Sequence, residues 1–308
     1  KTFFFDEIQE VKGWEKFARR LFTESYKLFI TGSNAKLLSS EIATSLTGRN
    51  MKLELYPFSF KEHLSYHNFP IKQVYTTKEK ALISKNLKEY LAYGGFPEIV
   101  LSKDYEELNE IYQDVIINDL LVRFAIRDTK DFRELALYLL SNISQRISFN
   151  NLKNLLNFSN TSKVKNYIDF LSEAYLFFTV FKYEYSMKKQ IINNRKIYAI
   201  DQGLVNAVSF SFSKNEGKLI ENVVFLELKR QKQEVYYYQE EAECDFVIKK
   251  GAKIAHAIQV SVSLSKPETM KGEIKGLLKA MDKFKLKEGT IVTLSEERKI
   301  TIDKKIVR

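Results

Sequence analysis

The hydrophobic pattern of the first 56 residues alternates between the periods of strands and helices. Apolar runs at Thr2–Phe5 and Lys27–Thr31 have the length of buried strands. Helical periodicity follows each of them, at Trp14–Phe22 and Ala35–Leu46, and Met51–Leu55 then alternates apolar and polar residues. This rhythm of strand, helix and strand is typical of a parallel sheet.

The rest of the chain divides where the hydrophobic period changes. Residues 61–130 predict helices with a turn at 93–97, and residues 131–215 predict three helices followed by two strands. Residues 216–308 predict a helix, several strands, a second long helix and a final pair of strands. We therefore expect an α/β fold in four regions, beginning with residues 1–60.

Composition places the chain among globular proteins. Hydrophobic residues make up 44% of its 308 residues and aromatic residues 13%. No apolar run approaches the roughly 20 residues that cross a bilayer, and the first residues lack a secretory signal. Cys244 is the single cysteine, which excludes an intrachain disulfide and fits a reducing compartment. We expect a cytoplasmic protein without a membrane partner.

The net charge of +10 is unevenly distributed. Residues 141–200 contain nine lysines and arginines against three acidic residues. A basic segment of this kind favours a polyanionic partner such as nucleic acid, but it also suits a solvated surface. Charge alone leaves both interpretations open.

An apolar strand that ends in two adjacent acids opens the chain. In a P-loop ATPase the first acid, here Asp6, would bind Mg²⁺, and the second, Glu7, would orient the attacking water. Ser33 or Asn34, after the next strand, could contact the γ-phosphate, and Arg49 could stabilise phosphoryl charge. An acid pair after a strand also suits a helix N-terminus, and Arg49 also suits a helix end.

A set of short motifs in a fixed order carries a resemblance to a known family. The chain resembles the prokaryotic AAA-type P-loop ATPases that carry a C-terminal region of unknown function. The match runs along essentially the whole chain. The motifs are Asp6-Glu-Ile-Gln9, Trp14, Thr31-Gly-Ser-Asn34, Leu46-Thr-Gly-Arg49, Leu55-Tyr-Pro-Phe-Ser-Phe60 and Gly94-Gly-Phe-Pro97.

This resemblance implies a nucleotide-driven switch whose full-length form uses ATP and Mg²⁺. Residues 1–60 would be the part of the AAA core that runs from the Walker B strand to the arginine, and residues 61–130 its helical lid. The 308 residues contain no Gly-x-x-x-x-Gly-Lys-Ser/Thr motif, so the family's Walker A loop is expected before residue 1. We expect that this chain alone neither binds nor hydrolyses ATP.

Residues 131–215 predict a winged helix, with Thr161–Tyr175 as its third helix. In DNA-binding members of that class the third helix enters the major groove and the wing reaches phosphates. Many winged helices instead serve as protein-interaction modules, so the partner stays open between DNA, another protein and a homo-oligomer of this chain. The candidate DNA-contacting residues are Lys163, Lys165, Asn166, Lys188, Lys189 and Arg195.

Residues 216–308 follow the layout of PD-(D/E)xK nucleases, a restriction-endonuclease-like fold. Glu221 on a helix and Asp245 on a strand match the metal-binding acids of that class. Gln259 and Ser261 stand where a carboxylate and a lysine are expected, and nothing in the sequence requires Lys253 or Lys266 to replace that lysine. We expect a degenerate site kept for structure or binding, with a metal-dependent nuclease as the alternative.

Two histidines have a spacing that can bind a metal. His63 and His67 stand four residues apart on a predicted helix. Because the sequence offers no third ligand nearby, we expect them in ordinary surface or core positions.

Overall fold

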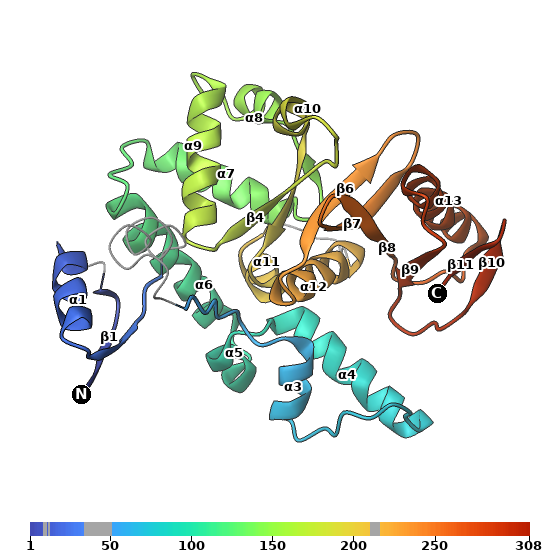
Figure 1. Ribbon diagram of the computed structural model, residues 1–308, viewed down its shortest axis with the longest axis horizontal. Coiled ribbons are helices and arrows are strands. Elements are labelled where there is room, and N and C mark those ends of the chain that lie inside the picture. Colours follow the sequence, from blue (N-terminus) through green and yellow to red (C-terminus); the bar gives the residue numbers. More distant parts are fainter. Residues whose placement is uncertain (9–10, 12, 34–50, 210–215) are drawn as a thin grey trace.

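The computed structural model describes residues 1–8, 11, 13–33, 51–209 and 216–308 (Figure 1). Asn34 and Arg49 therefore lie outside the described residues, as does the helix expected at 35–46. Of the described helices, none is both long enough and apolar enough to span a bilayer.

The N-terminal region is a strand–helix–strand unit, as the sequence predicts, but its strands are not buried: exposed and half-buried residues alternate along both. Strands β1 (Thr2–Phe5) and β2 (Lys27–Ile30) pair in parallel, and α1 (Trp14–Thr23) connects them. Trp14 and Ala18 of α1 are buried against the sheet together with Ile8. This packing fixes the carboxyl ends of both strands at one edge.

The strand expected at Met51–Leu55 does not form. These residues have no regular secondary structure, and the side chains of Met51, Leu53 and Leu55 are all exposed. Alternation alone does not make a strand, because its backbone groups also need a neighbouring strand to pair with.

Helices fill residues 60–122, as expected. A capping box between Ser59 and Glu62 starts the first of them, and a second between Thr76 and Glu79 starts the long α4. Figure 1 shows this group to the right of β1 and below the sheets that the later residues form. The helices are α3 (Phe60–Tyr66), α4 (Thr77–Tyr93), α5 (Pro97–Ser102), α6 (Tyr105–Asp114) and the π-helical η3 (Val115–Val122).

The middle region combines helices with a three-stranded antiparallel sheet of order β3-β5-β4. Its large core joins the helices to that sheet and includes Phe132, Leu171 and Phe177. The elements are α7 (Thr129–Ser141), β3 (Arg146–Ile147), α8 (Phe149–Leu155), α9 (Thr161–Glu173), β4 (Phe177–Phe181), α10 (Met187–Ile192), β5 (Arg195–Ala199) and α11 (Gln202–Val208). The winged-helix assignment of this region stays a prediction.

The C-terminal region is a six-stranded sheet of order β10-β11-β9-β8-β7-β6. Alternate residues of β7 face opposite sides, so Phe246 and Ile248 pack towards α12 while Val247 packs towards α13. The elements are α12 (Glu216–Arg230), β6 (Glu234–Gln239), β7 (Glu243–Lys250), β8 (Lys253–Val260), α13 (Pro267–Phe284), β9 (Glu288–Val292), β10 (Ile300–Ile302) and β11 (Lys305–Val307).

The paired glycines of the Gly94-Gly-Phe-Pro97 motif allow three segments to meet. Gly94 has a φ of 82°, and a Cβ there would overlap the carboxylate of Asp201. A Cβ on Gly95 would overlap the carbonyl of Phe58. The amide of Phe58 donates to the carbonyl of Gly95 at 2.6 Å. Asp201 in turn accepts from the amides of Gly95 and Gly203, both at 2.7 Å. The motif therefore joins residues 58, 95 and the start of α11.

Candidate functional site

Asp6 and Glu7 lie at the carboxyl end of β1, beside the residues that follow β2. The hydroxyl of Thr31 donates to Oδ1 of Asp6 and accepts from the amide of Glu7 at 3.1 Å. The amide of Ser33 donates to Oε2 of Glu7 at 3.3 Å. Both acids are exposed. The predicted meeting of Asp6, Glu7 and Ser33 at one sheet edge is therefore present in the structure.

The backbone of Glu7 adopts an unusual conformation. Its φ is 43°, in the left-handed region that residues other than glycine rarely adopt. Such conformations cost free energy and concentrate at functional sites. The positive φ turns the chain sharply after Asp6, and both carboxylates therefore lie at the end of the strand.

Arg123, the residue that follows η3, contacts this edge, although no sequence pattern selects it. Its Nη2 donates to Oγ of Ser33 at 3.0 Å and to Oδ1 of Asp119 at 3.1 Å. The side chain of Arg123 is 17% exposed. No local signal marks it, because Ser33 and Arg123 are 90 residues apart in the sequence.

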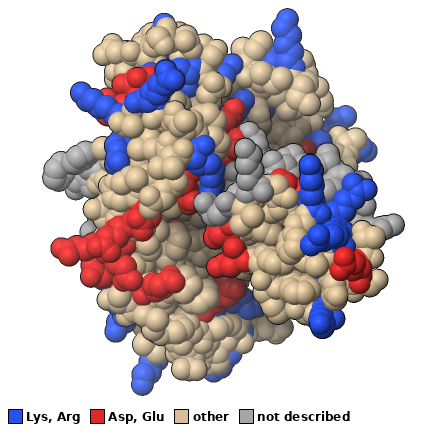
Figure 2. Space-filling model, turned by 90° about the vertical axis from the view of Figure 1, so that its left-hand side faces the viewer, with Lys and Arg blue, Asp and Glu red and all other residues tan. Residues whose placement is uncertain are grey.

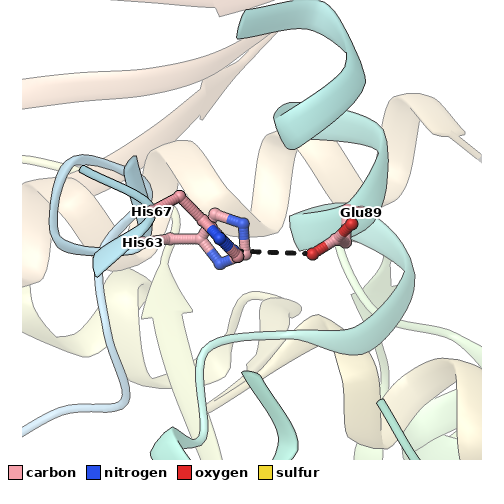
Figure 3. A group of neighbouring side chains, drawn as sticks. All are labelled: His63, His67 and Glu89. Carbon is pink, nitrogen blue, oxygen red and sulfur yellow. Dashed lines mark ion pairs between the residues drawn. The ribbon is translucent and has the colours of Figure 1, made fainter. Parts of the chain in front are cut away.

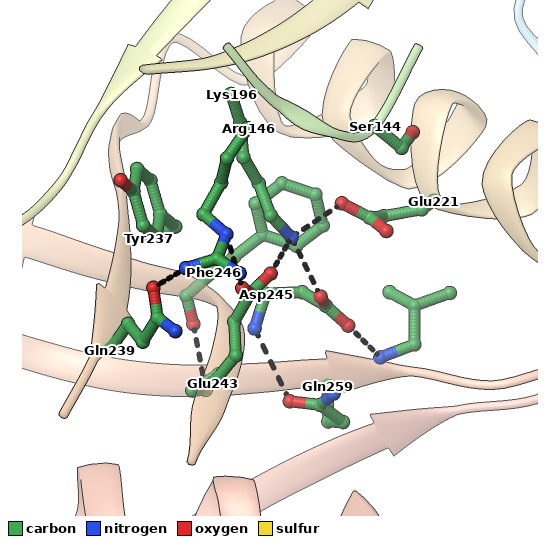
Figure 4. A network of polar contacts seen from close by, with 12 residues as sticks. Ser144, Arg146, Lys196, Glu221, Tyr237, Gln239, Glu243, Asp245, Phe246 and Gln259 are labelled. Atoms are coloured by element: carbon green, nitrogen blue, oxygen red, sulfur yellow. Dashed lines mark hydrogen bonds and ion pairs between the residues drawn. The ribbon is translucent and has the colours of Figure 1, made fainter. Parts of the chain in front are cut away.

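A second polar cluster lies where the middle and C-terminal regions meet, and Lys196 of β5 is its centre (Figure 4). Its ammonium Nζ lies 2.9 Å from Oε1 of Glu221, 2.6 Å from Oε1 of Glu243 and 2.9 Å from Oδ1 of Asp245. The Lys196 side chain is 2% exposed. Oε1 of Glu221 also accepts from the hydroxyl of Tyr198 at 2.7 Å. One buried cation thus neutralises part of a group of three carboxylates, of which Asp245 is buried and Glu221 and Glu243 are half-buried.

Burial and charge shift the pKa values in this cluster. Burial alone would lower the pKa of Lys196, but Asp245, Glu221 and Glu243 outweigh it and raise that pKa above its ordinary value of 10.5. Burial and the neighbouring Asp245 raise the pKa of Glu221 to about 7, against the opposing effect of Lys196. Lys196 is therefore permanently charged, whereas Glu221 can hold a proton near neutral pH.

Comparison with known proteins covers the whole chain. An AAA domain matches residues 1–64, a domain of unknown function (DUF8612) matches 84–215, and another (DUF4143) matches 216–307. An uncharacterized protein of Methanocaldococcus jannaschii is 41% identical over 99% of this chain and 71% of its own length. The chain belongs to this family of AAA-domain proteins. An uncharacterized protein of Haemophilus influenzae is 32% identical over 92% of this chain and 70% of its own length.

The AAA-domain match places Asp6, Glu7 and Ser33 within the ATPase-like part of the family. Mg²⁺ prefers hard oxygen ligands, and the exposed carboxylate of Asp6 fits that preference. Arg49 and Asn34 fall within the matched residues but outside the described ones. Arg123 is the cation that the described residues bring to this edge.

Within the DUF4143 region the structure brings together only part of the predicted nuclease-like set. Glu221 and Asp245 meet at Lys196, and Gln259 accepts from the Asp245 amide at 3.2 Å and donates to Glu273 at 2.6 Å. Ser261 instead donates to the carbonyl of Ser263 at 3.2 Å.

The lysine of this cluster comes from another region of the chain. Lys253 and Lys266, the nearby lysines in the sequence, are exposed. Lys196 of β5 instead lies beside the carboxylates, together with Glu243, and neither residue was predicted from the sequence. Lys196 and Asp245 are 49 residues apart in the sequence, so no local motif indicates their pairing.

The candidate DNA-contacting residues of the middle region divide into two groups. Lys165, Asn166, Lys188 and Lys189 are exposed, as expected. Lys163 instead pairs with Asp128 at 2.6 Å and Asp131 at 2.8 Å. Through these ion pairs Lys163 connects α9 to the start of α7.

Arg195 also has an internal role. Its guanidinium Cζ lies 4.3 Å from the centre of the Phe181 ring and 5.1 Å from that of Phe149. Burial lowers the pKa of Arg195.

On the face drawn in Figure 2, basic and acidic side chains form separate patches. The positive charge is thus not one continuous surface on that face.

Proposed function

We propose that the protein is a nucleotide-driven switch of the AAA type, with Asp6 and Glu7 as its catalytic carboxylates. The observation that carries this proposal is the parallel pairing of β1 and β2, which gathers both acids, Thr31 and Ser33 at one edge. Phosphoryl transfer in ATPases depends on positioning and electrostatics, and a strand-end acid pair is suited to both.

Each residue at this edge has a distinct proposed role. Asp6, oriented by the Thr31 hydroxyl, would be an oxygen ligand for the Mg²⁺ that neutralises phosphate charge. Glu7 would orient and polarise the attacking water. Ser33 would sense the terminal phosphate, since its hydroxyl already accepts from Arg123. Nucleotide binding would then compete for that hydrogen bond and change the position of η3.

Two contacts support the proposal that the other regions respond as effectors. Nη2 of Arg230, at the end of α12, donates at 2.7 Å to the carbonyl of Pro57, within the residues that the AAA domain matches. Lys196 joins the sheet of the middle region to α12 and β7. A movement of the helical region therefore has a direct physical route to the C-terminal region.

The proposal is tested by nucleotide affinity. Protein expressed from the complete natural reading frame should bind ATP in isothermal titration calorimetry, and Mg²⁺ should strengthen that binding. Asp6→Asn should remove most of the Mg²⁺ effect while leaving metal-free ATP binding intact. Absence of ATP affinity in the complete protein, or an Mg²⁺ effect that survives Asp6→Asn, would contradict it.

DNA binding is a second candidate function for the middle region. Lys165, Lys188 and Lys189 are exposed and leave their charges available to phosphates. Affinity for duplex DNA should fall steeply with salt, and Lys188→Gln/Lys189→Gln should reduce the slope of log K against log salt by about 2. A slope near zero in the unaltered protein would reject this function.

The geometry favours a structural role over a nuclease role for the carboxylate cluster. A metal shared by Glu221 and Asp245 would have to lie between their oxygens, at about 2.0–2.6 Å from each. The Lys196 ammonium, 2.9 Å from an oxygen of both, already occupies that space. A nuclease would therefore require Lys196 to withdraw. We propose that the cluster is a joint between two regions, and cleavage of DNA with Mg²⁺ or Mn²⁺ that Asp245→Ala abolishes would refute this.

A further inference from the structure

Two histidines and a carboxylate meet between α3 and α4 (Figure 3). His63 lies in α3, His67 is the residue that ends it, and Glu89 projects from α4. One potential ligand atom of each residue lies within 4.8 Å of those of the other two. The third ligand that the sequence did not reveal is thus supplied by a second helix.

His63 is the unusual member of this group. It is 1% exposed, yet neither of its ring nitrogens has a hydrogen-bond partner. Aromatic rings surround it, with the ring centre of His67 at 4.7 Å and that of Tyr90 at 5.4 Å. Buried polar atoms are normally paired, so two unpaired nitrogens on one side chain require an explanation.

We propose that His63, His67 and Glu89 form a binding site for a divalent transition metal, with Zn²⁺ as the best match. Zinc accepts imidazole nitrogen and carboxylate oxygen together, and two histidines four residues apart on one helix can reach the same ion. A bound ion would satisfy a nitrogen of His63 that has no partner. It would also clamp α3 to α4, with water as the fourth ligand.

The present arrangement needs only small movements to accept the ion. Tetrahedral zinc with ligands at about 2.0–2.1 Å requires ligand atoms roughly 3.3 Å apart. His67 and Glu89 can approach, because their side chains are 30% and 21% exposed and Nε2 of His67 lies 3.5 Å from Oε1 of Glu89. His63 provides the fixed point, and burial lowers its pKa to about 4, so it is neutral and able to ligate.

Lys103 is the competitor for this site. Its Nζ lies 2.9 Å from Oε1 of Glu89, and its side chain is 43% exposed. An exposed lysine can swing into solvent when a divalent ion arrives. Removing its charge should therefore strengthen metal binding several-fold.

The experiment uses untagged 308-residue protein that has been stripped of metal by a chelator. Titration with Zn²⁺ at pH 7.5 should give one equivalent bound with a dissociation constant in the micromolar range or tighter. Co²⁺ should give the visible absorption of a tetrahedral site. His67→Ala and Glu89→Gln, at partly exposed positions, should each weaken Zn²⁺ binding at least tenfold, and Lys103→Gln should strengthen it.

Matched variants separate this site from adventitious binding. His256 lies on β8 and contacts Thr290, away from α3, so His256→Ala should bind Zn²⁺ like the unaltered protein. His63→Leu keeps the buried position apolar and should lose the site while remaining folded. The proposal is overturned if Zn²⁺ binds no more tightly to the unaltered protein than to His67→Ala and Glu89→Gln, or if Lys103→Gln binds it no better.

Discussion

Nζ of Lys196, on a strand of the middle region, lies 2.9 Å from Oδ1 of Asp245, on a strand of the DUF4143 region. Asp245 is further held because its Oδ2 accepts from the amide of Val260 at 2.9 Å. A buried ammonium from one region thus completes an acidic cluster of another. This contact links the sheet of the middle region to the sheet of the C-terminal region.

Removing the ammonium should strongly destabilise the protein. Lys196→Met nearly keeps the length of the side chain but leaves the buried Asp245 carboxylate and the half-buried Glu221 and Glu243 carboxylates without their cation. Breaking a buried ion pair in this way costs about 3–5 kcal/mol, which urea unfolding at pH 7.5 would measure. Lys188→Met, at an exposed position, is the control and should change stability by less than about 0.5 kcal/mol. A loss below 1 kcal/mol in Lys196→Met would show that the cluster does not hold the regions together.

The raised pKa of Glu221 should make stability depend on pH. Its folded pKa of about 7 exceeds the ordinary 4.5, so the folded state binds more protons between these values. The contribution is fully present below about pH 4.5 and is lost as the pH rises through 7. Glu221→Gln cannot titrate and retains an oxygen that accepts from Tyr198 and Lys196.

Between pH 5 and pH 8 the unaltered protein should therefore lose on the order of 2–3 kcal/mol relative to Glu221→Gln. Urea unfolding of both proteins across this range measures the difference. Parallel pH profiles would mean that Glu221 keeps its ordinary pKa in the folded protein.

A side chain at Gly95 should disrupt the meeting of residues 58, 95 and 201. Gly95→Ala would force its Cβ against the carbonyl of Phe58, and the backbone must shift to relieve this. We expect a loss of about 2–4 kcal/mol in the free energy of unfolding. Gly272→Ala is the matched control, because its Cβ meets nothing within 4 Å inside α13. That control should gain about 0.5–1 kcal/mol, and equal effects of the two changes would contradict the packing described here.

The backbone strain at Glu7 predicts a conflict between stability and activity. Glycine adopts a φ of 43° without steric cost, so Glu7→Gly should raise the free energy of unfolding by about 0.5–1 kcal/mol. The same change removes the carboxylate that would orient water. Unchanged or lower stability in thermal unfolding would indicate that the conformation of Glu7 is not strained.

The sequence predicts those helices and strands whose hydrophobic spacing and capping residues lie within the element itself. The helices of residues 60–122 and the elements of residues 216–308 follow from apolar spacing and from caps such as Ser59 and Thr76. The strand predicted at Met51–Leu55 does not form, because a strand must pair with a neighbouring strand and the alternation of apolar and polar residues does not indicate one.

The candidate sites divide in the same way. Asp6, Glu7 and Ser33 were predicted because adjacent parallel strands end at the same edge. Arg123, Lys196 and Glu89 were missed because each reaches its partners from an element that is distant in the sequence. Only the tertiary fold determines such pairings.

Turnover by the complete protein tests most directly whether Glu7 acts in ATP hydrolysis. Protein from the complete reading frame should hydrolyse ATP in the presence of Mg²⁺, and Glu7→Gln should lower kcat at least 100-fold while ATP still binds. Glu15→Gln, which changes an acid in the first turn of α1, should retain nearly full activity. Turnover that persists in Glu7→Gln, or that falls equally in Glu15→Gln, would contradict the account.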